Sequence, residues 1–298
     1  NMQQTDLRQE RKYCARLGWA LTLTMICAIV WQVGLMGLML AGRLAGGMST
    51  YMLLALVGYY LPALPLSYWL CRRIPVTAPV RRPLTVRLLV RWFVIGIGLM
   101  WVGSLTGSWL NDLVYQVAHL ETVDLVTETF NEMPMAVVLL GACVLGPLCE
   151  ELLFRGLLAG RLTRYGQKPA AFVSALLFGL YHANLSQFFY AFLLGLLLAY
   201  AYFYTGKLKT SVVLHMLFNF YGSFIVFLLP EDGVLPVLYG LSWPVLTIVG
   251  AVLLVRGRTR QVWEHGPCEP SMWVVFGSVG MTLAIILCFV QTATMYVF

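Results

Sequence analysis

The chain has 298 residues, of which 60% are hydrophobic and only 11% are charged, and its mean hydropathy is +0.79. These values exclude a water-soluble globular domain and predict an all-α, polytopic integral membrane bundle, with residues 1–298 in a single membrane domain. The net charge of +7 comes from basic residues in short loops between apolar segments. Such charges are typical of contacts with the lipid bilayer rather than with nucleic acid.

Eight apolar segments approach or exceed the roughly 20 residues that cross a bilayer. They cover about 17–42, 50–71, 88–110, 134–158, 186–205, 210–229, 235–255 and 272–297. A shorter segment at 169–184 raises the expected number of membrane helices to eight or nine. Because the polar stretch DLRQERKYCAR leads straight into the first segment, we expect that segment to be retained as an anchor, not cleaved as a signal peptide.

The loop charges predict an orientation. Arginine and lysine crowd the loops at 8–16, 72–91, 161–168, 207–209 and 256–260, whereas the loop at 111–133 carries five acidic residues and no arginine or lysine. If 169–184 counts as a span, basic and non-basic loops alternate along the chain. Arg43 is the one basic residue that lies in a loop expected to be non-basic. The positive-inside rule then gives nine spans, with the N-terminus in the cytoplasm and the C-terminus outside. We expect the protein to lie in the cell membrane.

Three charged residues interrupt the fourth apolar segment, in the stretch GPLCEELLFRGLL at 146–158. A charge near the bilayer centre costs about 2.5–3.5 kcal/mol. Glu151 and Arg155 lie four residues apart, with the acid first, which predicts a neutralising ion pair on one helix face. Glu150 projects about 100° away and is left to face a cavity or another helix. We expect Pro147 to kink the helix and open space beside Glu150.

Two further segments carry polar residues to a similar depth. FGLYHAN places Phe178 and His182 on one helix face, and HMLFN does the same for His215 and Asn219. At 1.5 Å per residue, Glu150, both histidines and the asparagine lie roughly 9 to 21 Å from the nearest basic loop residue. If the three helices are neighbours, these side chains form one site.

This set of side chains favours hydrolysis of an amide or ester without a covalent intermediate. Glu150 with His182 could hold and deprotonate a water, and His215 with Asn219 could donate hydrogen bonds to the oxyanion. The G-x-S-x-G motif of serine nucleophiles is absent, and Cys149 projects about 100° from Glu150. Purely structural roles stay open for the same residues. The Glu–Arg pair could stabilise the helix, the histidines could be hydrogen-bonded packing residues, and Asn219 could hold two helices together.

A zinc site is the alternative to a site without metal or other cofactor. Two histidines and a glutamate are a plausible ligand set. However, H-E-x-x-H is missing and the ligands would come from three separate helices, which favours the metal-free reading. The seven cysteines lie mostly in or beside apolar segments without a Cys-x-x-Cys pair, so we interpret them as small apolar side chains.

Taken in order, Glu150-Glu151-x-x-x-Arg155, Phe178-x-x-x-His182 and His215-x-x-x-Asn219 resemble the motifs of the CAAX protease and bacteriocin-processing (CPBP) family. Its eukaryotic members are the type II CAAX prenyl endopeptidases of the endoplasmic reticulum. The resemblance covers about 134–229, and it implies a conical intramembrane helical fold with a glutamate-dependent proteolytic mechanism. It implies that Glu150 and His182 activate water, that His215 and Asn219 form the oxyanion site, and that Glu151, Arg155 and Phe178 support them.

The resemblance implies a membrane-presented peptide or protein as substrate but does not fix which one. Loop charges and span lengths suggest a prokaryotic plasma membrane, which favours a peptide pheromone or bacteriocin leader, or immunity against one, over CAAX maturation. A non-catalytic peptide-binding, immunity or scaffold protein of the same fold is the alternative. A proton-coupled transporter is a third hypothesis, against which the lack of an internal repeat argues. The sequence leaves the oligomeric state open.

Overall fold

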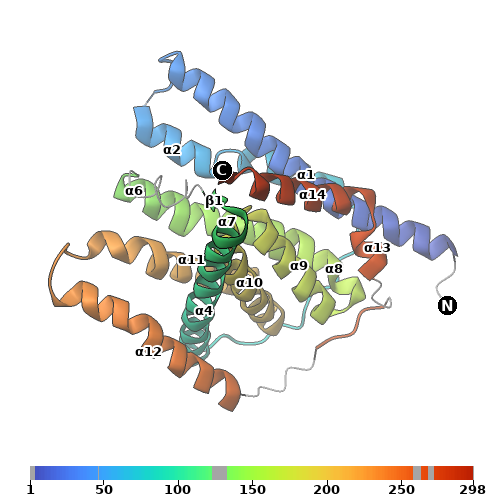
Figure 1. Cartoon of the computed structure of the whole chain (residues 1–298). Helices are drawn as coiled ribbons and strands as arrows, with labels where there is room; N and C mark the ends of the chain where they lie inside the picture. Colours follow the sequence, from blue (N-terminus) through green and yellow to red (C-terminus); the bar gives the residue numbers. More distant parts are fainter. Residues whose placement is uncertain (1–3, 46, 123–132, 258–262, 268–271, 298) are drawn as a thin grey trace.

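The computed structural model describes residues 4–45, 47–122, 133–257, 263–267 and 272–297, which form a bundle of helices (Figure 1). The first half contains α1 (Gln4–Leu40), α2 (Gly47–Val57), α3 (Tyr60–Cys71), α4 (Val86–Ala118), α6 (Met135–Val137), η1 (Val138–Leu145), α7 (Gly146–Glu151), η2 (Leu152–Ala159), α8 (Gly160–Leu162) and η3 (Thr163–Tyr165). The second half contains α9 (Gln167–Tyr181), α10 (Leu185–Thr205), α11 (Leu208–Asn219), η4 (Phe220–Phe224), η5 (Ile225–Leu228), α12 (Val234–Arg256), α13 (Met272–Phe276) and α14 (Val279–Ala293).

The predicted all-α, polytopic bundle is confirmed. Within the described ranges, seven helical segments are long and apolar enough to cross a membrane, and they coincide with the first seven long segments expected from the sequence. The expected short segment at 169–184 forms α9, and the expected last span divides into α13 and α14. At 15 residues each, α9 and α14 are about 22 Å long, which is less than the thickness of the hydrocarbon core.

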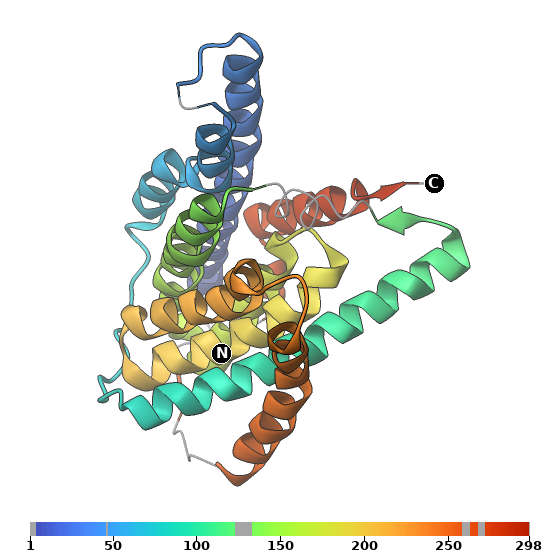
Figure 2. The same cartoon turned by 90° about the vertical axis from the view of Figure 1, so that its left-hand side faces the viewer.

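Within the ranges that the structure describes, the strands form one small antiparallel pair. Strands β1 (Glu121–Thr122) and β2 (Tyr296–Val297) join the end of α4 to the C-terminal segment, as Figure 2 shows. The Tyr296 hydroxyl also donates a hydrogen bond of 2.7 Å to Asn111 Oδ1 in α4. Six cysteines are free in the described part of the chain, whereas Cys268 lies outside it.

Two layers of helices pack around the segment that contains α7 and η2. On one side α1 packs against α3 and α14, and on the other α10 packs against α4 and α9 while α12 packs on α4 (Figures 1 and 2). Where α1 and α14 cross, a Cβ on Gly18 would lie 2.0 Å from the Met281 nitrogen, and one on Gly280 would lie 2.2 Å from the Ala15 oxygen. The glycines therefore permit a backbone contact that any side chain would prevent.

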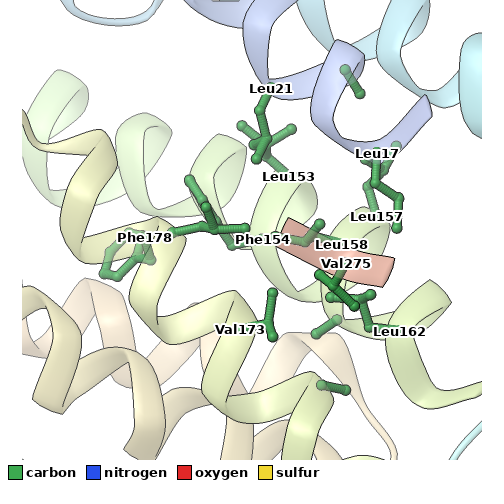
Figure 3. Close-up of a cluster of buried hydrophobic side chains, with 14 of the residues drawn as sticks. Leu17, Leu21, Leu153, Phe154, Leu157, Leu158, Leu162, Val173, Phe178 and Val275 are labelled. Atoms are coloured by element: carbon green, nitrogen blue, oxygen red, sulfur yellow. The ribbon is translucent and has the colours of Figure 1, made fainter. Parts of the chain in front are cut away.

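A buried apolar cluster holds the α7–η2 segment in place. Figure 3 shows Leu21 and Leu17 of α1 beside Leu153 and Leu157 of η2, and Phe178 of α9 beside Phe154. Each of these side chains is at most 2% exposed. Close packing of this kind leaves little freedom to rotate the segment, so its polar side chains have fixed directions.

The turns on either side of α10 are set by local hydrogen bonds. Asn184 caps the start of α10, where its Oδ1 accepts a hydrogen bond of 2.9 Å from the Ser186 nitrogen. Gly206 ends the helix in the left-handed conformation, with φ of +64°, which glycine adopts at little cost. These two caps set the start and the end of α10, which connects α9 with Phe178 to α11 with His215 and Asn219.

Candidate active site

Glu150 and Glu151 end α7, a six-residue α-helical segment between two π-helical segments, η1 and η2. Pro147 lies at the start of α7, immediately after η1, where its missing N–H cannot take part in a regular helical ladder. Short π-helical insertions bend a helix and are frequent at functional sites. The two glutamates thus lie in a regular α-helical turn of an otherwise irregular membrane helix.

The predicted Glu151–Arg155 ion pair is confirmed. Arg155 Nη1 donates a hydrogen bond of 2.8 Å to Glu151 Oε1, and both side chains are 0% exposed. Two full charges in an apolar bundle require further polar partners, because attraction alone does not offset their desolvation. The structure supplies these partners from two other helices.

Arg155 is held from the side of α9 and α10. Its Nη2 donates a hydrogen bond of 3.0 Å to the Gly195 carbonyl, and its guanidinium carbon lies 4.5 Å from the centre of the Phe178 ring. A Cβ on Gly195 would lie 3.2 Å from Arg155 Nη2 and 3.0 Å from the Ala175 Cα. Glycine at this position therefore lets the guanidinium approach the backbone carbonyl without a steric clash. The contact with Phe178 is a buried cation–π interaction, which adds to the stabilisation of the charge.

Glu151 is held from the side of α11. Its Oε1 also lies 3.0 Å from Nδ1 of His215, whose side chain is 5% exposed. Since a carboxylate accepts, Nδ1 carries the proton and the ring orientation is fixed. The other ring nitrogen, Nε2, lies 3.6 Å from Glu150 Oε2. His215 therefore stands between the two adjacent glutamates, a contact that helical spacing did not indicate.

Glu150 differs from Glu151 in that its side chain is 22% exposed and lines a cavity of about 560 Å³. His182, His215 and Asn219 line the same cavity, as does Phe178. The structure thus brings the four side chains with predicted catalytic roles together around one space, from α7, the end of α9, and α11. Glu151 and Arg155 do not line it and lie behind it as the buried pair.

His182 lies at the end of α9 on a constrained turn. Its Nδ1 donates a hydrogen bond of 2.8 Å to the Phe178 carbonyl, which leaves Nε2 for the cavity. The next residue, Ala183, has φ of +50°, a conformation that is costly for any side chain except glycine, asparagine or aspartate. The imidazole also packs edge-on against the Phe178 ring, with 4.8 Å between ring centres.

Phe178 connects the parts of the site. Besides Arg155 and His182, its ring contacts His215 edge-on at 5.6 Å between centres and Phe154 at 5.1 Å. Asn219, which also lines the cavity, donates a hydrogen bond of 2.8 Å from Nδ2 to the Ala142 carbonyl in η1. These contacts fix the rotamers of side chains from three helices relative to one another.

Sequence reasoning missed Gln187, Tyr190 and Ser223, which also line the cavity. Gln187 and Tyr190 are three residues apart in α10, a spacing that places them on one face of the helix. The centres of the His182 and Tyr190 rings are 6.5 Å apart. The polar side chains of Gln187 and Tyr190 in the first turns of an otherwise apolar helix could have indicated that α10 contributes to the site.

No three histidine, cysteine, aspartate or glutamate side chains form a metal-binding group among the residues that the structure describes. One nitrogen of His215 is occupied by Glu151, and Nδ1 of His182 by a backbone carbonyl. In both His182 and His215, Nε2 is the ring nitrogen that these bonds leave for a further partner. Whether the site works without metal stays a prediction.

The fold and the cavity together define a multi-pass membrane protein with a cavity inside its helical bundle that is lined by a glutamate, two histidines and an asparagine. Residues 132–221 match the model of the family described as type II CAAX prenyl endopeptidase Rce1-like. The matched range contains all seven predicted site residues, and the resemblance inferred from their motifs is confirmed. The activity to which the family points is that of a CAAX-type endopeptidase, a hydrolase. No curated protein and no solved structure matches the chain.

The buried ion pair leads to a test of stability. Arg155→Met leaves the carboxylate of Glu151 buried without its cation, and we expect a loss of about 3–5 kcal/mol in the free energy of unfolding. The measurement is the thermal unfolding of the protein purified in detergent. Replacing both partners, as in Glu151→Gln with Arg155→Met, should restore part of the loss because no unpaired charge remains.

Glu150→Gln is the matched control, since this carboxylate faces the cavity and should affect unfolding little. If Arg155→Met melts at the wild-type temperature, the pair does not hold the site together.

Proposed function

We propose that the protein is an intramembrane endopeptidase that hydrolyses a peptide bond of a membrane-presented peptide or protein. The observation that carries the proposal is the shared cavity of Glu150, His182, His215 and Asn219. Its volume of about 560 Å³ is in the range of cavities that hold a short peptide segment or a small molecule. The match to the endopeptidase family supports the same reaction.

Glu150 is proposed as the general base. Its carboxylate takes a proton from a water held between it and Nε2 of His182, while the water oxygen bonds to the carbonyl carbon of the substrate. The same carboxyl group then returns the proton to the departing amine as the C–N bond breaks. Glu151 is unsuited to this role, because Arg155 and His215 already occupy its Oε1 and it is fully buried.

His215 and Asn219 are proposed as donors to the oxyanion. Glu151 orients the His215 ring through Nδ1–H, and the ring donates as an imidazolium, whose second proton on Nε2 points into the cavity. The Asn219 amide nitrogen has two hydrogens, of which the bond to Ala142 uses one. Donors fixed in advance by such second contacts stabilise the developing charge without further reorganisation.

The proposed substrate is a peptide pheromone or bacteriocin leader, lipidated or otherwise presented by the membrane, at a prokaryotic cell membrane. The apolar walls of the cavity, which include Leu56, Val57, Leu194 and Phe227, suit a substrate that reaches the site within the bilayer. A soluble peptide would have to give up its hydration to enter. Prenylated CAAX proteins are not proposed as substrates.

The general-base role has a direct test. Glu150→Gln should lower peptide cleavage by about a hundredfold or more, because the amide cannot accept the proton, while the protein stays folded in detergent. Comparative peptidomics of cells with wild-type protein and with Glu150→Gln would reveal both the loss and the substrate. Cys149→Ala, at the neighbouring residue that does not line the cavity, is the control and should cleave normally.

Full cleavage by Glu150→Gln would refute the glutamate mechanism. If cells with Glu150→Gln, His182→Ala or Asn219→Ala keep the phenotype of cells with the wild-type protein, the result would instead favour a non-catalytic peptide-binding or immunity role.

We propose that the reaction needs no metal or other cofactor. Cleavage by the purified protein should then persist after incubation with EDTA and with phenanthroline, and the protein should contain less than one zinc per chain. Activity that disappears with both chelators and returns with added zinc would reverse the proposal. A zinc protease of known chelator sensitivity, assayed in parallel, controls for effective chelation.

We also propose that the N-terminus lies in the cytoplasm and the C-terminus outside. Alkaline phosphatase fused after residue 298 should then be active, because the enzyme requires the oxidising side of the membrane, whereas a fusion after Lys168, at the end of the basic segment 161–168, should be inactive. Activity of the second fusion with inactivity of the first would invert the orientation.

A further inference from the structure

A second cavity lies on the other side of α10 from the candidate active site. It measures about 500 Å³ and is bordered by α4, α9, α10 and α12, with leucine as the most frequent residue in its lining. Leu194 and Ala191 of α10 line the active-site cavity, whereas Leu193 and Leu196 line this one. No role in the proposed reaction accounts for it. We call it the basic groove, after the residues at its end.

The basic groove is cationic at one end only. Arg91, near the start of α4, and Lys168, near the start of α9, both line it, and no acidic residue does so in the described part of the chain. Leu99 and Leu193 line the opposite part, and Leu99 lies eight residues beyond Arg91, about 12 Å deeper along the helix. The groove is therefore amphipathic along its length, with charge at the end that adjoins the basic loops.

Aromatic side chains accompany the charges. Tyr200 and Trp263 line the same end of the groove and contact each other edge-on, with 5.8 Å between ring centres. Trp92 also lines the groove and contacts Tyr200 at 5.9 Å. Tyrosine and tryptophan next to arginine and lysine are characteristic of the boundary between lipid tails and headgroups. The open end of the groove thus has the composition of the membrane interface.

The guanidinium of Arg91 is held in a fixed place. Its Nη2 donates a hydrogen bond of 2.8 Å to the Leu253 carbonyl near the end of α12, and it fills the space where residue 257 would have a side chain. A Cβ on Gly257 would lie 0.8 Å from Nη2, so glycine is required here. One bond uses one of five guanidinium donors, which leaves others for a phosphate.

We propose that the basic groove binds one anionic phospholipid, with its phosphate at Arg91 and Lys168 and an acyl chain along the leucine wall. The two cations favour an anionic headgroup, and the deep apolar part of the groove favours an acyl chain. A free phosphate would meet only the charged end and would leave the apolar wall uncovered. The proposal does not depend on proteolysis.

Native mass spectrometry of the full chain from nanodiscs tests the proposal. From discs that contain phosphatidylcholine and phosphatidylglycerol, the wild type should retain phosphatidylglycerol preferentially. Lys168→Gln should lower this preference about fivefold, because it removes one of the two cations. Lys209→Gln is the matched control: Lys209 is also exposed near the start of a helix, but it does not line the groove.

Leu196→Trp tests the apolar wall. The indole fills the groove while both cations remain, so retention of phosphatidylglycerol should fall although the charge is unchanged. Gly257→Ala should act in the same direction by displacing Arg91, and melting temperatures report whether either variant is folded.

An unchanged preference in Lys168→Gln overturns the proposal even if the other variants fail to fold. An equal loss in Lys209→Gln also overturns it, because net surface charge would then explain the effect. Displacement of the lipid by inorganic phosphate alone would show that the apolar wall contributes nothing.

Discussion

The arrangement of the site depends on the need to neutralise two charges inside a membrane bundle. Glu151 and Arg155 are both 0% exposed, and their ion pair alone does not offset the loss of hydration. The remaining hydrogen bonds and the cation–π contact come from His215, Gly195 and Phe178, which belong to α11, α10 and α9. Three helices are thus held in one relative position by the requirements of one buried pair, and that position also forms the cavity.

The same pair connects stability to chemistry. Glu151 Oε1 accepts hydrogen bonds from both Arg155 and His215, so the group that neutralises the arginine also sets the direction of the imidazole. The adjacent Glu150 projects to another side of the helix, is 22% exposed and lines the cavity. Two neighbouring glutamates therefore have separate tasks because a helix turns about 100° per residue.

Local spacing predicted what lies on one helix: the Glu151–Arg155 pair, the separate direction of Glu150, and the grouping of polar residues by depth. Contacts between helices could not be predicted in this way, because depth fixes the layer of a side chain but not the rotation of its helix. The position of His215 between two carboxylates was missed for this reason. The π-helical segments η1 and η2 were missed as well, since their sequences have no local signal that distinguishes them from an α-helix.

Helix α10 separates the active-site cavity from the basic groove, and it takes part in both. Its Gly195 carbonyl accepts the hydrogen bond from Arg155, while Leu193 and Leu196 on another face line the groove. Packed interiors transmit displacements instead of absorbing them. The lipid proposed for the groove would pack against the same helix whose Gly195 carbonyl accepts the hydrogen bond from Arg155. The family match ends at residue 221, so α12 with Gly257, and likewise Arg91 of α4, lie outside it. Part of the groove is thus formed by residues outside the range that matches the family.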